Sequence, residues 1–334
     1  MSIAAGKITI STSPFLHGVD TTPRIMWEVT LTLLPVVAAA YYFFGLAALL
    51  LIGATIAGCL AAEYLFLPAT KRKSALRDGS ATLTGLLLAL CLPPGFPLWM
   101  SFVGGFVAIG MGKMIWGGLG NNVFNPALVG RAFLQAAFPT AITTWSAPDG
   151  RYLSLRGTNL ALPFFQGHAV DAISSATPLA TMKFDHVAAP LMQLLWGNTS
   201  GSLGETSAIL FILAGLYLLF RKIINWRIVL SIVAMVVAFS GIFWLMDGSR
   251  YPSPLFMLLS GGLLLGTVYM ATDLVTSPIT PRGLWIYGLG IGFLVVLIRT
   301  WGGLPEGVMY AILLMNACTP LINRFTKIKP YGHS

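Results

Sequence analysis

Charged residues are scarce in this chain of 334 residues. Asp, Glu, Lys and Arg together make up 9% of it, whereas hydrophobic residues make up 56%. A soluble domain carries about 25% charged residues, so most of this chain cannot face water. Apolar runs recur from Ile25 to Ile322, and many are long enough to cross a hydrocarbon core of about 30 Å. The composition excludes a string of soluble domains and predicts a polytopic all-α membrane protein in a lipid bilayer.

Motifs for metals and hydrolysis are also missing. The three cysteines, Cys59, Cys91 and Cys318, are isolated in apolar stretches and cannot ligate a four-thiolate iron–sulfur cluster. The four histidines lie outside the apolar runs, whereas a haem cytochrome needs axial ligands inside its bundle. No Walker-type phosphate loop and no Ser-His-Asp spacing stand out. We therefore expect neither a bound metal nor a cleavable signal, since the start of the chain is polar through Arg24.

About ten transmembrane helices are predicted, some of them short or broken. They cover residues 25–44, 46–67, 80–92, 98–115, 125–138, 205–220, 228–246, 255–272, 284–300 and 304–322. The third segment ends at Pro93-Pro94-Gly95, where proline removes backbone donors. A membrane tolerates broken helices only where protein covers the backbone or a cavity adjoins it. The short segments are therefore expected inside the bundle, framing a site.

The placement of Lys and Arg predicts the orientation. If the N-terminus is cytoplasmic, the inner connections carry most of the 20 basic residues, including clusters at 71–77 and 221–227. Such a bias is the topology signal of membrane proteins, so the net charge of +9 does not indicate nucleic-acid binding. Both termini are then cytoplasmic, and the long connection 139–204 lies on the outer face.

Two pairs of similar strings suggest an internal repeat. Gly85-Leu86-Leu87-Leu88-Ala89 is echoed by Gly262-Leu263-Leu264-Leu265-Gly266, and Trp116-Gly117-Gly118-Leu119 by Trp301-Gly302-Gly303-Leu304. Five helices per half is an odd number, so the halves are expected to be inverted, an arrangement that many transporters use to build a midplane site. The prediction is one integral membrane domain, 1–334, with a first repeat at 1–138, an outer connection at 139–204 and a second repeat at 205–334.

The outer connection contains the most informative string, Asp171-Ala172-Ile173-Ser174-Ser175-Ala176-Thr177-Pro178. Pro178 pushes Thr177 toward an extended conformation. The small neighbours leave room for a bulky group to approach the threonine hydroxyl, and Asp171 is an acceptor that could orient a donor or a metal. A surface loop is also where a modifying enzyme could reach. From these residues alone, a polar turn in which Asp and Ser cap a short helix is the favoured interpretation.

The same string resembles a known modification signature. It is similar to the D-G-x-S/T-G-A-T sequence at which a flavin transferase joins FMN to threonine, in subunits of the Rnf complex and of the sodium-pumping NADH:quinone oxidoreductase. Ala172 and Ser175 stand where glycine is usual, and both are small. Three further strings of this chain resemble motifs of the same family: Gly117–Phe133, Ala271–Asp273 and Tyr331–His333. On these motifs the chain is identified as a member of the RnfD/NqrB family over residues 13–333, and its length and ending fit the RnfD branch.

This resemblance implies two flavins. One is FMN bound covalently to Thr177, with Asp171 opening the recognition sequence and Ser174, Ser175 and Ala176 beside the attachment site. The other is a non-covalent riboflavin near the inner glycine–asparagine segment, where Asn122 and Asn125 are the candidates. Uncharged donors and acceptors beside glycines suit a neutral, aromatic ligand. Helix packing and capping are the alternative role for these asparagines.

Several ionisable residues fall inside or at the ends of the apolar segments: Glu28, Glu63, Lys113, Arg131, Asp273 and Arg299. Charges at membrane depth are functional candidates by default. Arg131 and Asp273 lie in broken regions and are expected to contact a ligand or couple an ion, and Glu28 is a second ion-coupling candidate. Lys113 and Arg299 are expected to snorkel to an interface.

Three functions remain open at this stage. The resemblance implies a redox subunit of an ion-translocating ferredoxin:NAD oxidoreductase in the bacterial inner membrane. It would be inactive alone, would carry its FMN on the periplasmic side, and would relay electrons coupled to Na⁺ or H⁺ transport. Its partners would be Rnf subunits A, B, C, E and G, with a flavin transferase for maturation. A channel or secondary transporter for a small solute, and a purely structural assembly subunit, are the alternatives. A pure transporter has no need of the Asp171–Thr177 string.

Overall fold

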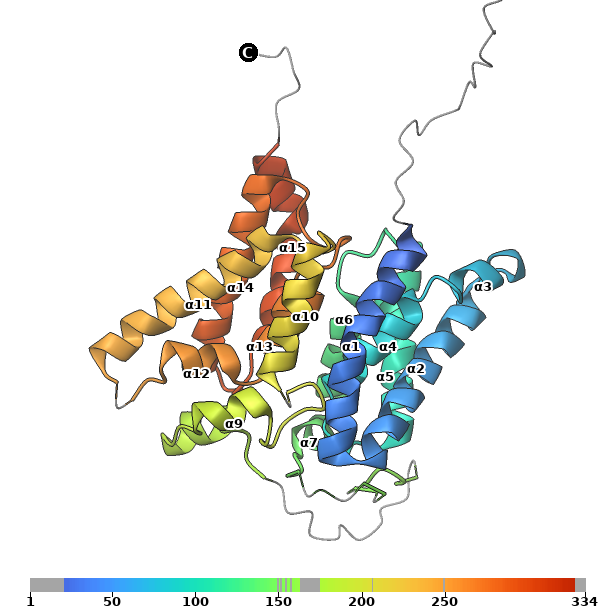
Figure 1. The fold of residues 1–334 in the computed structure, drawn as a ribbon. Coiled ribbons are helices and arrows are strands. Elements are labelled where there is room, and N and C mark those ends of the chain that lie inside the picture. The colour runs from blue at the N-terminus through green and yellow to red at the C-terminus, as the bar shows by residue number, and fades with distance from the viewer. Residues whose placement is uncertain are drawn as a thin grey trace, which may run out of the picture.

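A computed structural model describes residues 21–327 apart from 149, 151, 154, 157, 163–174, 206 and 249, and this part of the chain is helical without strands. The first-half helices lie together on one side of the bundle and the last helices on the other, with α10 between them (Figure 1). One apolar core runs through both halves, from Leu33 and Leu88 to Leu265 and Ile312. The two halves therefore pack as one body.

The first half consists of six helices and a π-helical turn. They are α1 (Thr22–Phe44), α2 (Leu46–Phe66), α3 (Ala69–Ala75), α4 (Ser80–Leu90), α5 (Leu98–Ile109), the turn η1 (Gly110–Met114) and α6 (Pro126–Ala137). Helices α2 and α5 pack backbone to backbone, because a Cβ atom on Gly105 would lie 2.3 Å from the Thr55 carbonyl oxygen. Small residues permit such close approach between apolar helices.

The second half contains a broken helix at its centre. Its elements are α10 (Ala208–Phe220), α11 (Trp226–Met246), α12 (Pro254–Leu259), α13 (Leu263–Leu265), the π-helical turn η3 (Gly266–Met270), α14 (Pro281–Trp301) and α15 (Val308–Phe325). The break falls at Ser260–Gly262, where Gly261 has a φ of 65°, a conformation that side chains with a Cβ rarely adopt. At this break, backbone N–H and C=O groups inside the bundle are therefore left without partners within the helix.

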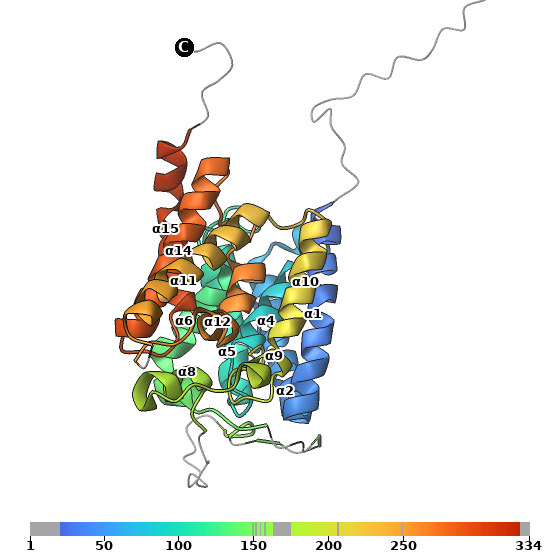
Figure 2. The same cartoon turned by 60° about the vertical axis from the view of Figure 1, so that its left-hand side comes forward.

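Four short elements lie at the end of the bundle opposite to both ends of the described chain (Figures 1 and 2). They are α7 (Pro139–Thr143), α8 (Pro178–Ala180), the π-helical turn η2 (Thr181–Asp185) and α9 (Leu191–Trp196). Leu179, Met182 and Leu194 pack against Phe256 of α12 in a separate apolar cluster. This cluster fixes the segment that follows Thr177 onto the second half.

Helix occurs in each of the ten predicted segments, and the segment 255–272 is divided into three pieces. Five helices of the described chain, α1, α2, α11, α14 and α15, are long and apolar enough to cross a membrane. Helices α4 and α10, and α5 together with η1, are apolar but shorter. The chain is therefore built as a multi-pass membrane protein, while ten crossings and an inverted repeat stay predictions.

Candidate functional site

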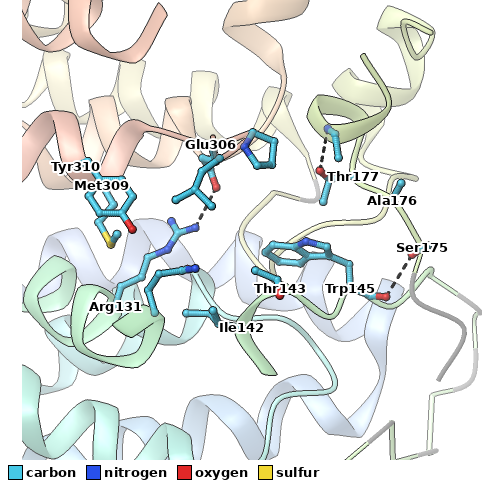
Figure 3. Close-up of a pocket in the computed structure, with 14 residues that line it drawn as sticks. Arg131, Ile142, Thr143, Trp145, Ser175, Ala176, Thr177, Glu306, Met309 and Tyr310 are labelled. Carbon is cyan, nitrogen blue, oxygen red and sulfur yellow. Dashed lines mark hydrogen bonds and ion pairs between the residues drawn. The ribbon is translucent and has the colours of Figure 1, made fainter. Parts of the chain in front are cut away.

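Thr177 lies in the wall of a cavity of about 330 Å³ at the end of the bundle that carries α7–α9 (Figure 3). Ser175 and Ala176 border the cavity beside it, and Arg131 and Glu306 stand on the opposite wall. The remaining lining is mostly apolar or aromatic and includes Ile142, Trp145, Leu304, Pro305, Met309 and Tyr310. An apolar cavity with a few convergent polar groups is the usual form of a small-molecule site.

The backbone around Thr177 has the predicted extended conformation, with φ −74° and ψ 154°. Its hydroxyl oxygen accepts a hydrogen bond from the Ala180 N–H at 3.2 Å and so caps α8. The Ser175 N–H donates to the Trp145 carbonyl oxygen at 3.0 Å, which places the indole beside the attachment segment (Figure 3). Of the predicted recognition residues, Asp171 and Ser174 lie outside the described part of the chain.

The sequence predicts an exposed loop at Thr177, and the structure differs. Thr177 is only 6% exposed, because α8 and η2 fold back onto α12 through the apolar cluster. A modifying enzyme can therefore reach the hydroxyl only through the mouth of the cavity or before these segments pack.

Lys183 ties the segment after Thr177 to the far wall of the cavity. Its ammonium donates to the carbonyl oxygens of Ile298 at 3.4 Å and Leu304 at 2.9 Å, and also to that of Gly302. Burial lowers the pKa of Lys183. A cation at the C-terminal end of α14 also matches the negative end of the helix dipole. Lys183 thus fixes the position of η2 relative to the end of α14 and the connection after it, on the other side of the cavity.

Arg131 comes from α6 of the first half, and Glu306 from the connection before α15. The two form an ion pair of 3.0 Å that faces the cavity. Arg299 does not reach an interface, as snorkelling would require. It is 4% exposed and donates to the carbonyl oxygens of Met257 at 2.6 Å and Ser260 at 3.1 Å. The predicted snorkelling of Arg299 is therefore wrong. Its guanidinium instead donates hydrogen bonds to the free carbonyl oxygens of the broken helix.

A second, smaller cavity of about 70 Å³ brings together Asn122, Asn125 and Asp273. Asn125 caps α6 by accepting from the Ala127 N–H at 3.0 Å, and it donates to the Met270 carbonyl oxygen at 3.3 Å. Asn122 donates to the Phe124 carbonyl oxygen at 3.2 Å. Asn125 thus has the capping role that the sequence left open, while both asparagines line the cavity.

The two predicted ion-coupling residues lie in different surroundings. Asp273 borders the smaller cavity and accepts hydrogen bonds of 3.3 Å from the Val275 N–H and from the Thr276 hydroxyl. Glu28 of α1 is clamped by Arg221, at 2.6 and 3.1 Å, and by the Tyr217 hydroxyl at 2.9 Å. Glu28 therefore joins α1 to α10 and does not line either of the two cavities described above.

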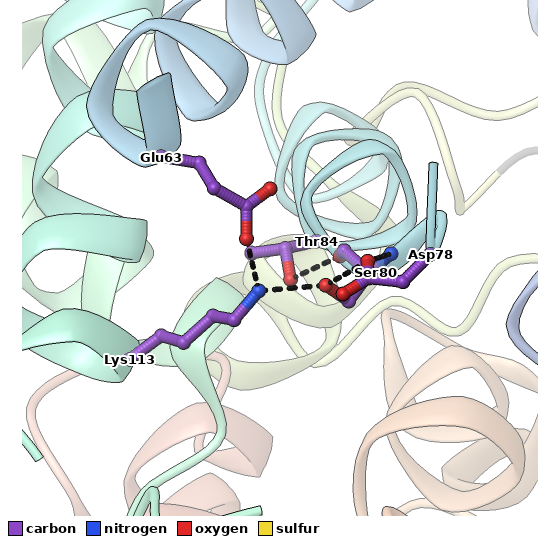
Figure 4. A network of polar contacts seen from close by, with 5 residues as sticks. All are labelled: Glu63, Asp78, Ser80, Thr84 and Lys113. Carbon is purple, nitrogen blue, oxygen red and sulfur yellow. Dashed lines mark hydrogen bonds and ion pairs between the residues drawn. The ribbon is translucent and has the colours of Figure 1, made fainter. Parts of the chain in front are cut away.

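Lys113 also lines the smaller cavity, and it is 3% exposed, so the predicted snorkelling was wrong here too. Its ammonium donates to Glu63 and, at 2.7 Å, to the Ser80 hydroxyl (Figure 4). The Ser80 hydroxyl donates onward to Asp78 at 2.6 Å. This buried chain of contacts joins α2, the N-terminus of α4 and η1.

Sequence reasoning missed two residues, Glu205 and Glu306. Both lie in the first residues of predicted segments, 205–220 and 304–322, but the structure places them in the connections before α10 and α15, and they were not selected among the charges of the apolar segments. The glycine-rich string that ends at Leu304 was noticed only as a repeat. Leu304 stands two positions before Glu306, and this closeness of the string to an acidic residue was the signal that could have selected Glu306. Among the described residues, no group of three or more His, Cys, Asp and Glu side chains is placed to hold a metal ion.

Apolar spanning helices, a broken helix at the centre and one ligand-sized cavity beside Thr177 define a polytopic helical membrane protein with a binding site. The chain belongs to the NQR2, RnfD, RnfE family, whose model matches residues 9–332.

Curated relatives extend over almost the whole chain. It is 41% identical to the D subunit of the proton-translocating ferredoxin:NAD(+) oxidoreductase complex of Clostridium ljungdahlii, over 97% of this chain and 96% of the relative. It is 43% identical to the D subunit of the ion-translocating oxidoreductase complex of Stutzerimonas stutzeri, over 93% and 92%. The D subunit of the Na(+)-translocating ferredoxin:NAD(+) oxidoreductase complex of Acetobacterium woodii is 39% identical, over 98% and 96%.

Proposed function

We propose that this chain is the flavin-carrying membrane subunit of an ion-translocating ferredoxin:NAD oxidoreductase complex, with FMN joined to Thr177 through a phosphoester. The relatives named above are D subunits of such complexes. The observation that carries the flavin part is the position of Thr177 in the wall of a cavity of about 330 Å³. Ligand pockets of small molecules usually begin at about 300 Å³, so the cavity has room for a flavin ring.

The chemistry of the lining fits this group. Trp145, Ile142 and Met309 supply apolar and aromatic surface for a planar ring, and Gln135 and Arg131 supply donors. The guanidinium of Arg131 offers a positive charge to the phosphoester or to electron density gained by the ring. When bound, the FMN would supply the electron transfer itself. The protein's own residues fix its position, exclude water and set the surrounding charge.

The same arrangement supports the proposed location. Helix α8, which Thr177 caps, is at the end of the bundle opposite to both ends of the described chain, which supports a periplasmic flavin if the termini are cytoplasmic (Figure 2). Electrons would arrive from a partner redox protein and pass inward. The partners are proposed to be Rnf subunits A, B, C, E and G in the bacterial inner membrane, with a flavin transferase for maturation. Relatives of similar identity are named for protons and for sodium, so overall similarity does not select the ion.

The test is the mass of the chain made together with its flavin transferase. We expect the denatured protein to gain the mass of one FMN less one water and to fluoresce in a gel. Peptide mapping should place the added mass on the peptide that contains Thr177. A dark band of unmodified mass would favour the channel or transporter instead.

A non-covalent riboflavin is proposed at the smaller cavity. Support comes from Asn122, Asn125 and Asp273, which converge there, and from the adjacent glycines Gly118 and Gly120, around which a Cβ would meet no atom within 4 Å. The cavity of about 70 Å³ is smaller than a flavin ring, so the ring would have to enter from this glycine-rich side. Asp273, with Glu28, remains a proposed ion-coupling residue.

Replacing Asn122 by alanine is expected to remove most of the riboflavin without affecting the covalent FMN, because the side chain lines the cavity. The flavin released by denaturing the purified complex would be separated and counted. Asn121→Ala is the matched control, since Asn121 is the exposed neighbour. Equal riboflavin in wild type and Asn122→Ala would reject this assignment.

A further inference from the structure

Four charged side chains from both halves of the bundle meet behind the wall of the larger cavity. They are Arg131 of α6, Glu205 of the connection before α10, Arg299 of α14 and Glu306 of the connection before α15. Glu306 is the central member: it pairs with Arg131 at 3.0 Å and accepts from the Gly262 N–H at 2.6 Å. Arg131 and Glu306 also line the cavity, so the cluster borders the proposed flavin directly.

The two carboxylates of this cluster lie close to each other. A Cβ atom on Gly262 would lie 2.9 Å from Glu306 Oε1 and 3.7 Å from Glu205 Oε1, so both oxygens are close to the same peptide. Glu205 Oε1 has no hydrogen-bond partner among the described residues, and the other oxygen of Glu205 accepts from the Ser202 N–H at 3.4 Å. Two neighbouring buried carboxylates do not both stay ionised without cost, and one proton between them removes that cost. We therefore expect the resting pair to hold a shared proton.

An independent observation points to a small polar ligand at the same place. Across the described residues, buried side-chain polar atoms without a partner include Glu205 Oε1, Arg131 Nε, Arg299 Nε and Ser260 Oγ. Arg299 and Ser260 are 4% and 0% exposed, and the two are joined by a hydrogen bond. Buried polar atoms are nearly always paired with protein or with water. Such a concentration of unpaired atoms indicates water molecules around the carboxyl pair.

The charges decide which cation the cluster holds. With one shared proton, the two guanidinium groups face one carboxylate charge, and a bound Na⁺ would add further repulsion. If the proton leaves, two carboxylates face two guanidinium groups and the cluster becomes neutral. The arginines thus stabilise the state after proton release. Among the described residues, the buried Cys91 thiol at the end of α4 also lies close to Arg131, and Tyr310 lines the larger cavity.

We propose that Glu205 and Glu306 form a hydrated proton-donor site for the group bound in the larger cavity. One electron arrives at the bound flavin from a partner redox protein, and one proton moves to the same flavin from the carboxyl pair. The pair, then doubly ionised and balanced by Arg131 and Arg299, regains its proton from water. The proton transfer rests on the proposed function of the cavity, whereas the shared proton rests on the cluster alone.

The experiment uses the intact complex and follows reduction of the covalent flavin by stopped-flow absorbance. Glu205→Gln and Glu306→Gln are expected to slow the protonated step on the order of a hundredfold, the usual size of a general-acid contribution. A small weak acid added to the buffer should restore part of the rate, which a purely structural defect would not allow. Glu205→Asp should retain most of the rate. Asp185→Asn is the control, because Asp185 is an exposed carboxylate of η2 that lines neither cavity.

The outcomes separate the two proposals. Wild-type chain without flavin on Thr177 rejects the proposed function. Full flavin content with wild-type rate and pH profile in Glu205→Gln rejects the proton donor and leaves the proposed function intact. A flavin reduction rate that depends on Na⁺ concentration and not on pH would assign the cluster to sodium and would also overturn the proton-donor proposal. If the variants do not assemble, the proposal is tested on the wild-type complex. Its flavin reduction is expected to be slower in D₂O than in H₂O, and an unchanged reduction rate contradicts the proposal.

Discussion

Replacing Thr177 by alanine is expected to yield a chain that carries no covalent flavin. Alanine has no hydroxyl to form the phosphoester, so the loss should be complete. The fold should persist, because within the described part of the chain the Thr177 hydroxyl makes only the capping contact with the Ala180 N–H at 3.2 Å. Loss of such a cap costs about 1 kcal/mol. The measurement is flavin fluorescence of the denatured band, together with the intact mass of the chain.

Thr181→Ala is the matched control for this variant. Thr181 belongs to the same outer segment and donates its hydroxyl hydrogen to the Pro178 carbonyl oxygen at 3.0 Å. It should keep the flavin, since its hydroxyl is turned to local backbone. A fluorescent Thr177→Ala band would place the attachment elsewhere. Loss of fluorescence in both variants would show that the shape of the segment, and not one hydroxyl, decides modification.

The same variant distinguishes the redox role from a role in assembly alone. Because the lining of the cavity remains, the Thr177→Ala complex is expected to assemble with all its partners. Electron transfer through it should nevertheless be lost, since the flavin is no longer held at the outer end. A fully active complex that lacks this flavin would instead support the purely structural role.

The helices could be predicted from the sequence because apolar runs and capping residues coincide. Asn225, Ser253 and Thr280 each cap the helix that follows, and each stands at the polar edge of a predicted segment. Within the segment 255–272, hydropathy alone does not show the break. It depends on the left-handed backbone of Gly261, and on Arg299 of another helix to satisfy the free carbonyl oxygens.

The candidate site was predictable only in part. Thr177 and Arg131 were both selected, but not their convergence on one cavity, because they lie 46 positions apart (177 − 131) and no local pattern links them. Glu306, the partner of Arg131, was missed since pairing across 175 residues leaves no local pattern. Lys113 was misjudged for a related reason. Snorkelling is the usual fate of a lysine near a helix end, and only the packing of α2 against η1 brings Glu63 to it.

Replacing Lys113 by methionine is expected to destabilise the protein by about 3–5 kcal/mol, the usual cost of removing one partner of a buried ion pair. The substitution leaves the Glu63 carboxylate, which is 0% exposed, without its cation. Its second oxygen, Oε2, already lacks a partner among the described residues, so the charge would have little compensation. Thermal unfolding of the purified complex in detergent, with denaturant titration, measures the loss.

Two further variants test the physical reason. Adding Glu63→Gln to Lys113→Met removes the stranded charge and should recover much of the stability. Arg221→Met breaks the pair with Glu28, in which Arg221 is 43% exposed, and should cost no more than about 1 kcal/mol. Equal losses at the two pairs would contradict the argument from burial. If the double variant regains stability but not riboflavin, Lys113 contacts the ligand of the smaller cavity as well as holding α2, α4 and η1 together.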